Sequence, residues 1–150
     1  MGYEDERWMR LAVKLAWRCP PSDTAFSVGA VIVDSAGTEL SRGFSREGGD
    51  PVAHAEEAAL AKLSPGVPRL AGATMYSTLE PCSHRKSRLQ TCTELIIAAG
   101  LARVVIAWRE PALFVADAKG YELLSRAGLI VTEMPEFAAD AAAPNRHLSC

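Results

Sequence analysis

Four side chains that can bind a metal or transfer protons lie at three points of the sequence. His54 and Glu56 belong to the segment "HAE", which opens a run of strong helix formers, and Cys82 and Cys92 flank a short basic segment. One imidazole and two thiolates are a sound ligand set for a catalytic zinc ion, which takes three protein ligands and leaves the fourth position to water. We therefore expect His54, Cys82 and Cys92 to bind Zn²⁺.

Glu56 supplies what such a zinc site needs besides its ligands. Two thiolates offset the charge of the ion, so water on it loses a proton less readily than it would beside three neutral histidines. A carboxyl group near the helix start can reach past His54 toward this water without binding the metal. We predict that Glu56 is the catalytic residue that carries a proton to a ring nitrogen of the substrate and on to the leaving group.

Each of these residues also has an ordinary structural interpretation when it is taken alone. A single histidine is more often a surface or core residue, a glutamate in a first helical turn suits the helix dipole, and isolated cysteines are often buried. A disulfide between Cys82 and Cys92 is disfavoured, because the chain has only 4 cysteines and its first residues do not resemble a secretory signal. The coincidence of residue types, order and placement favours the metal site.

Length, composition and charge are those of one small domain. The 150 residues are 49% hydrophobic, and 16 basic against 18 acidic side chains give a net charge of −2. This balance argues against a long nucleic acid as ligand, and no apolar run reaches the roughly 20 residues that span a bilayer. We expect a cytoplasmic protein with one domain, residues 1–150, that binds neither a polynucleotide nor a membrane.

The elements that must position these residues follow from the spacing of apolar side chains. Helices are expected at 4–18, 53–63, 93–100 and 120–128. Strands are expected at 28–34, 38–45, 72–80, 103–108 and 129–134, the first two as an antiparallel hairpin. Because strands alternate with helices in the second half of the chain, the later strands are expected to be parallel. The last segment is expected to be a short helix followed by a loose tail.

The order of these residues matches a known signature. H-x-E followed by P-C and a second cysteine is typical of zinc-dependent deaminases, and here "HAE" and "PC" are intact, with nine residues (83–91) before the second cysteine. Together with "VGAVIV", "EPCSH" and "DAAAPNRHL", they make nearly the whole chain resemble the cytidine deaminase-like superfamily. Within it, the chain is most similar to the deaminase domain of the bifunctional riboflavin-biosynthesis deaminase/reductase.

The resemblance implies both a fold and a mode of action. The fold is α/β, with three α/β/α layers around a mixed five-stranded sheet whose last strands are parallel. The resemblance also implies a catalytic zinc on His54, Cys82 and Cys92, with Glu56 as proton shuttle. The partners it implies are a small nucleotide, nucleoside or base, water as co-substrate, and further copies of the chain in a homodimer or larger homo-oligomer.

Two departures from the family pattern bear on the substrate. The family commonly has an Asn-Pro pair just before "VG", whose Asn contacts the base, whereas this chain has Ala25 and Phe26. The loop between the cysteines is one residue longer than the usual riboflavin-type loop, and "RKSRLQ" replaces its Gly-Arg-Thr-Pro-Pro character. Base recognition is therefore expected to differ from that of the riboflavin-type relatives.

The expected substrate contacts surround the zinc site. Phe26 is either a wall of the pocket or a core aromatic, and the basic cluster between the cysteines either binds a phosphate or stays solvated. Backbone carbonyls near the end of the strand 72–80 are expected to hold the departing amino group. The residues predicted to bind substrate are Phe26, Ala53, Glu80, His84, Arg85, Lys86 and Arg88.

The leading hypothesis is a hydrolytic zinc-dependent deaminase that releases ammonia from an aminopyrimidine or purine. Its first candidate substrate is the riboflavin-pathway diaminopyrimidinone ribosyl phosphate; deaminases of cytidine or dCMP, of guanine or of a specialised metabolite are the alternatives. From another class, a non-catalytic structural zinc module would need a fourth protein ligand, for which His84 is the obvious residue. Glu56 argues for the enzyme. Cys19 and Cys150 do not lie in a comparable motif, so we expect them to be buried or to have no functional role.

Overall fold

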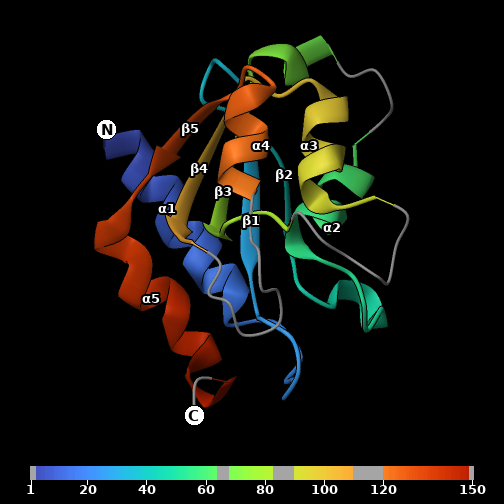
Figure 1. The fold of residues 1–150 in the computed structure, drawn as a ribbon, viewed down its shortest axis with the longest axis vertical. Helices are drawn as coiled ribbons and strands as arrows, with labels where there is room; N and C mark the ends of the chain where they lie inside the picture. Colours follow the sequence, from blue (N-terminus) through green and yellow to red (C-terminus); the bar gives the residue numbers. More distant parts are fainter. Residues whose placement is uncertain (1–2, 64–67, 83–89, 110–119, 149–150) are drawn as a thin grey trace.

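A mixed five-stranded sheet runs through the centre of the molecule (Figure 1). The computed structural model describes residues 3–63, 68–82, 90–109 and 120–148. The strands are β1 (Gly29–Val33), β2 (Glu39–Phe44), β3 (Thr74–Leu79), β4 (Arg103–Trp108) and β5 (Ile130–Glu133), in the order β2-β1-β3-β4-β5. β1 is antiparallel to β2 and β3, whereas β3, β4 and β5 are parallel. The predicted hairpin and the predicted parallel second half are confirmed.

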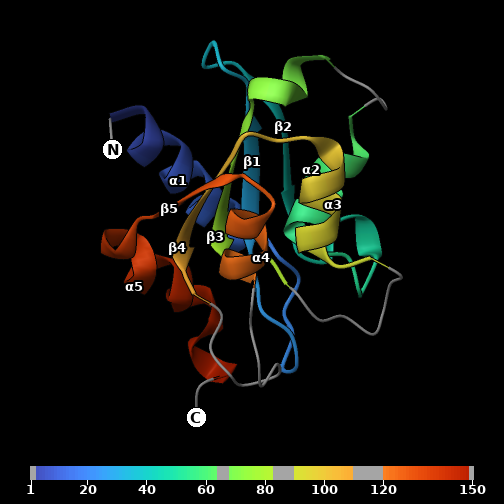
Figure 2. The same ribbon diagram turned by 45° about the horizontal axis from the view of Figure 1, so that its top comes forward.

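Helices cover both faces of the sheet and complete the three predicted layers (Figures 1 and 2). They are α1 (Tyr3–Ala16), α2 (Ala55–Ala61), α3 (Cys92–Ala99), α4 (Gly120–Arg126) and α5 (Ala138–Ala142). α1 and α5 pack on one face, and α2, α3 and α4 cover the other. Within the part of the chain that the structure describes, no helix is long and apolar enough to cross a membrane.

The apolar strand β1 is buried from both sides. Val31 and Val33 of β1 belong to the core cluster under α1, whereas Ile32 between them belongs to the cluster under α2 and α3. All five residues of β1 are buried. A strand covered by helices on both faces has no polar side, which explains why β1 reads as a continuous apolar run rather than as an alternating one.

Two glycines let helices approach the sheet closely. A Cβ atom on Gly29 would collide with the Ala12 carbonyl of α1, and one on Gly43 would lie 2.5 Å from the Ala55 carbonyl. Only a residue without a side chain fits at either position. Because Ala55 follows His54 directly, Gly43 sets the position of the metal-ligand segment relative to β2.

The C-terminal segment differs from the sequence-based prediction. Instead of a loose tail, α5 is followed by a 3₁₀ helix, Ala143–Leu148. Asn145 in this helix is 1% exposed and hydrogen-bonds to Ser27, 118 residues earlier in the chain. The prediction was wrong because the contacts that order this segment are long-range, and a short Ala-rich run followed by a proline carries no local sign of them.

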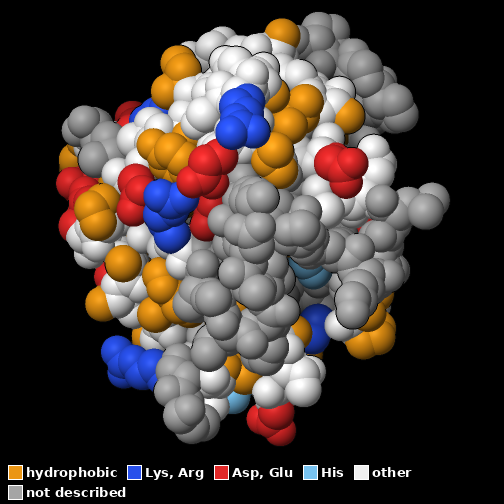
Figure 3. Space-filling model, viewed as in Figure 1, with side chains coloured by type: hydrophobic (Ala, Val, Ile, Leu, Met, Phe, Trp, Pro, Cys, Tyr) orange, Lys and Arg blue, Asp and Glu red, His pale blue; other side chains and the backbone are white. Residues whose placement is uncertain are grey.

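Charges of opposite sign are interspersed on the described surface (Figure 3). Arg109 lies 3.1 Å from Glu122, and Arg42 lies 2.6 Å from Glu39. Opposite charges at such distances largely cancel each other farther away. The described part of the face in Figure 3 therefore shows no large patch of one charge sign.

Candidate active site

The three predicted metal ligands lie together where β3 ends and two helices begin. Cys82 follows β3, Cys92 is the first residue of α3, and His54 directly precedes α2. Nδ1 of His54 lies 3.3 Å from Sγ of Cys92 and 3.5 Å from Sγ of Cys82. All three ligand atoms lie within 4.8 Å of one another. The fold thus gathers residues from three separate segments around one point.

These separations fit a tetrahedral zinc ion. With Zn–S near 2.3 Å and Zn–N near 2.0 Å, a sulfur and a nitrogen ligand at the tetrahedral angle lie about 3.5 Å apart. Both cysteines are buried, with Cys92 at 0% and Cys82 at 8% exposure, and His54 is partly buried. One imidazole and two sulfurs are also the donor types that zinc prefers.

The surroundings of the cysteines favour the thiolate, the form that binds metal. The hydrogen bond from the Cys92 thiol lowers the pKa of Cys82 against the opposing effect of burial, and His54 lowers it further. The backbone N–H of Cys92 also donates to Sγ of Cys82 at 3.2 Å. Cys92 lies at the start of α3, where Thr91 and Glu94 form reciprocal capping bonds and the helix dipole stabilises negative charge.

Glu56 is a buried carboxyl group beside these ligands. It is 4% exposed, and burial raises its pKa to about 6, an effect that the charge of His54 opposes and that of Cys82 reinforces. The hydroxyl of Ser77 in β3 lies 3.3 Å from Oε2 of Glu56 and donates to the Leu79 carbonyl at 2.8 Å. A carboxyl with a pKa this close to neutral can both accept and release a proton.

The segment that carries Cys82 is held in place by β4 and α4. The Glu80 N–H donates to the Trp108 carbonyl at 2.8 Å, and the Glu80 carboxylate accepts the N–H of Tyr121 at 2.7 Å. A Cβ atom on Gly120 would collide with the Pro81 carbonyl. Sequence reasoning missed Gly120, whose only signal is a glycine at the start of a helix.

The structure describes three of the seven predicted substrate-binding residues. Phe26 is partly buried, and its ring makes an edge-on contact with Trp108 at 5.5 Å between centroids. Ala53 is buried next to His54, and its carbonyl accepts the N–H of Arg46 at 2.8 Å. The side chain of Glu80 bonds to α4, as described above. The other four lie outside the described residues: His84, Arg85, Lys86 and Arg88.

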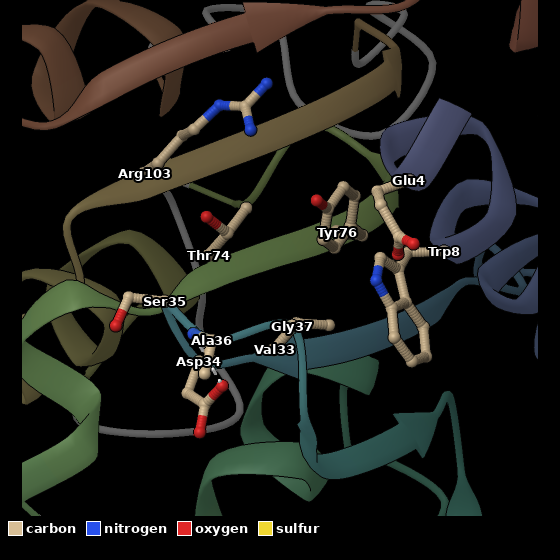
Figure 4. Close-up of a pocket in the computed structure, with 10 residues that line it drawn as sticks. All are labelled: Glu4, Trp8, Val33, Asp34, Ser35, Ala36, Gly37, Thr74, Tyr76 and Arg103. Atoms are coloured by element: carbon tan, nitrogen blue, oxygen red, sulfur yellow. Dashed lines mark hydrogen bonds between the residues drawn. The ribbon is translucent and has the colours of Figure 1, made fainter. Parts of the chain in front are cut away.

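A separate polar pocket of about 440 Å³ lies at the opposite end of the sheet (Figure 4). Its lining includes Val33 at the end of β1 and Thr74 and Arg103 at the starts of β3 and β4. Cys82, a predicted metal ligand, instead follows the end of β3. This pocket contains none of the predicted site residues, and it is distinct from the metal-ligand cluster.

Comparisons with known proteins agree with the geometry of the cluster. The family model for the cytidine and deoxycytidylate deaminase zinc-binding region matches residues 3–108. The diaminohydroxyphosphoribosylamino-pyrimidine deaminase of Schizosaccharomyces pombe is 44% identical over 140 residues, which are 92% of this chain and 34% of that protein. Riboflavin biosynthesis protein RibD of Escherichia coli is 39% identical over 133 residues, 86% of this chain and 33% of that protein. The chain spans about a third of the length of these relatives.

Solved structures share the fold. RibD of Acinetobacter baumannii has a TM-score of 0.79 at 33% identity, covering 97% of this chain and 39% of that one. Rib2 deaminase of Aspergillus oryzae has a TM-score of 0.71 at 24% identity, covering 97% of this chain and 99% of that one, a likeness of fold alone. From the matched region and these relatives, the chain belongs to the cytidine and deoxycytidylate deaminase family, which is defined by its zinc-binding region.

Proposed function

We propose that this protein is a zinc-dependent hydrolytic deaminase whose substrate is the diaminopyrimidinone ribosyl phosphate of riboflavin biosynthesis. The observation that carries the proposal is the convergence of His54, Cys82 and Cys92 beside the buried Glu56. The substrate follows from the name of the Schizosaccharomyces pombe relative, which is 44% identical over 92% of this chain. His54 Nδ1 and the two thiolates would hold the metal.

In the proposed reaction, an amino group on a ring carbon is replaced by oxygen from water, and ammonia leaves. A bound zinc ion would supply the Lewis acidity that makes water a nucleophile near neutral pH. Glu56 takes one proton from this water and gives it to a ring nitrogen; it then takes the second proton from the hydroxyl that has been added to the ring carbon and passes it to the departing amine, which leaves as ammonia. The burial of Glu56 keeps bulk water from competing for the proton and strengthens its interaction with the charge that develops on the ring.

The leaving amino group is assigned to the backbone carbonyls around Glu80. The Glu80 side chain bonds to Tyr121 in α4, so its part in binding falls to its main chain. Of the neighbouring carbonyls, that of Leu79 accepts the Ser77 hydroxyl at 2.8 Å and that of Pro81 accepts the Thr93 hydroxyl at 3.3 Å. These bonds fix the direction in which the carbonyls of this segment point.

Deamination of dCMP is the second candidate, because the matching family model is named for cytidine and deoxycytidylate deaminases. A structural zinc module is less well supported. Within the described residues the cluster has three ligands rather than four, and His84 lies outside them. Three protein ligands with a carboxyl group beside them, rather than among them, are the arrangement of a catalytic site.

The test is a measurement of zinc content together with ammonia release. The purified protein would be offered the diaminopyrimidinone ribosyl phosphate, dCMP, cytidine and guanine in turn. We expect about one zinc per chain and turnover of the first compound. Turnover of dCMP instead would move the assignment to the second candidate, and stoichiometric zinc without turnover of any compound would favour the structural module.

Replacing Glu56 by Gln tests the assigned proton carrier. Since the amide cannot transfer a proton, Glu56→Gln should lower kcat by about 10²- to 10⁴-fold and leave the zinc content unchanged. The matched control is Glu136→Gln, on an exposed residue far along the chain from the cluster, which should retain full activity. Full activity in Glu56→Gln would contradict the mechanism.

A further inference from the structure

Asn145 holds the segment 22–28 from the C-terminal side. Its Oδ1 accepts the Ser27 N–H at 2.6 Å, and its Nδ2 donates to the Ser27 carbonyl at 3.0 Å. Ring nitrogen Nε2 of His147 donates to the carbonyl of Ser22 at 2.6 Å. One buried side-chain amide thus satisfies both polar groups of the Ser27 backbone, as a neighbouring strand would. Aspartate has the same shape but no donor for the carbonyl.

Arg46 holds the same segment from the opposite side. Its Nη1 donates to the Phe26 carbonyl at 3.1 Å, and its Nη2 donates to the Ser27 hydroxyl at 2.7 Å. Nε and Nη2 also donate to the Pro20 carbonyl, at 3.1 and 2.8 Å. The residue is 7% exposed, and among the described residues its guanidinium donates only to carbonyls and this hydroxyl. Its planar fork of donors is what reaches three residues at once.

The backbone of Arg46 ties this segment to the metal ligands. Arg46 has a φ of 60°, which makes it the one non-glycine residue with positive φ in the described part of the chain. Its N–H donates to the carbonyl of Ala53, the residue before His54. A left-handed conformation costs energy for any residue except glycine and persists where surrounding contacts impose it. Arg46 therefore couples the start of α2 to the segment of Phe26.

Phe26 is the residue that these contacts hold in place. Its ring packs against a cluster that contains Ala55, which lies between His54 and Glu56, and it meets Trp108 edge-on. Phe26 therefore lies beside the segment that carries His54 and Glu56, where an aromatic ring can form a wall of the pocket. A wall selects a substrate by shape, which requires that its position be fixed before the substrate arrives.

From these contacts we propose that Arg46 and Asn145 are positioning residues that clamp Phe26 and Ser27 from two sides and thereby set the shape of the substrate pocket. The proposal rests on the deaminase function proposed above, because it assigns Phe26 to the wall of that site. The clamp acts on substrate binding, and Glu56 and the metal ligands carry the chemistry.

The clamp is tested with Asn145→Asp and Arg46→Lys, which keep size or charge but lose part of the hydrogen bonding. For the panel compound that the unchanged protein turns over, we expect KM to rise about tenfold or more while kcat stays within about twofold. Zinc content should not change. Arg146→Gln, on the exposed neighbour of Asn145, is the control and should leave KM unchanged. Ser27→Ala, which removes only the hydroxyl, should raise KM less than Arg46→Lys does.

A second measurement, made without substrate, separates the clamp from the proposed function. Hydrogen–deuterium exchange of the 22–28 backbone should become about tenfold or more faster in Asn145→Asp and Arg46→Lys, and stay unchanged in Arg146→Gln. If the unchanged protein turns over no compound, the proposed function fails and exchange alone decides whether the clamp holds the segment. A lower kcat with unchanged KM, or unchanged exchange, would overturn the clamp and leave Arg46 and Asn145 a general role in stability.

Discussion

Buried carboxyl groups at the two ends of the central sheet have pKa values that are shifted in opposite directions. At the end where β3 stops, burial raises the pKa of Glu56 to about 6. At the other end, burial also acts to raise the pKa of Asp5, but hydrogen bonds from Arg103 and Tyr76 outweigh it and lower the pKa below its usual value. The Asp5 carboxylate accepts hydrogen bonds from Nη1 and Nη2 of Arg103, at 3.1 and 2.8 Å, and from the Tyr76 hydroxyl at 2.6 Å.

This difference separates a carboxyl that can transfer protons from one that stabilises the fold. A buried acid without a full set of donors keeps a pKa near neutral, which suits proton transfer. A buried acid with a bidentate arginine stays ionised, and it joins α1 to β3 and β4. Substitutions at the two ends should therefore affect different measurements.

The largest effect is expected from removing a metal ligand. Cys92→Ser replaces a thiolate by a hydroxyl that binds zinc poorly, so the protein should lose its zinc on dialysis and its activity by more than about 10³-fold. Cys19→Ser is the matched control, because Cys19 lies outside the cluster and donates to the Val28 carbonyl at 3.4 Å, a bond that serine can also make. Zinc retention in Cys92→Ser would remove Cys92 from the ligand set.

Measuring both stability and kinetics in Asp5→Asn and in Glu56→Gln tests the contrast between the two ends of the sheet. Losing the buried pair with Arg103 should lower the free energy of unfolding by about 1–3 kcal/mol, because a guanidinium keeps only part of its hydrogen bonding. The kcat and KM of Asp5→Asn should stay unchanged, since Asp5 lies at the far end of the sheet. Urea unfolding and steady-state kinetics measure the two quantities. Equal losses of stability in both variants would contradict the division between the two ends.

The convergence of His54, Cys82 and Cys92 could be expected from the sequence because local motifs carry these residues. The "HAE" and "PC" segments, the hairpin and the parallel second half follow from patterns over a few residues. α2 begins at Ala55 rather than at Ala53 because His54 is extended and precedes the helix. Boundaries of this kind depend on single dihedral angles that apolar spacing does not reveal.

The residues that support the site were not predictable in the same way. Asn145 hydrogen-bonds to Ser27, which lies 118 residues earlier in the chain. Arg46 links two loops by hydrogen bonds to backbone carbonyls, which every residue has and which therefore leave no mark in the sequence. Nothing in the types of neighbouring residues encodes such contacts. The sequence leaves Phe26 as either a wall of the pocket or a core aromatic, because its contact with Trp108 joins segments far apart in the chain and Trp108 lies on β4, which pairs with β3.

The stability that Asp5 contributes should depend on pH. Since the pKa of Asp5 is lower in the folded protein than its ordinary value of 3.8, the ionised form favours folding above that value. This contribution is lost as the pH falls through the folded pKa. The difference in unfolding free energy between the unchanged protein and Asp5→Asn should therefore shrink between about pH 5 and about pH 2. A constant difference over this range would mean that Asp5 acts by packing rather than by charge.

The smallest effect tests whether burial or pairing gives the Asp5 cluster its stability. Arg42 and Glu39 form a bidentate pair at 2.6 and 2.7 Å, which is shorter than the pair of Asp5 and Arg103 at 3.1 and 2.8 Å. The Arg42 side chain, however, is 45% exposed against 25% for Arg103. Because water competes for exposed charges, Glu39→Gln should cost less than about 0.5 kcal/mol in urea unfolding. A loss as large as that of Asp5→Asn would show that hydrogen-bond geometry, rather than burial, sets the contribution of such pairs in this fold.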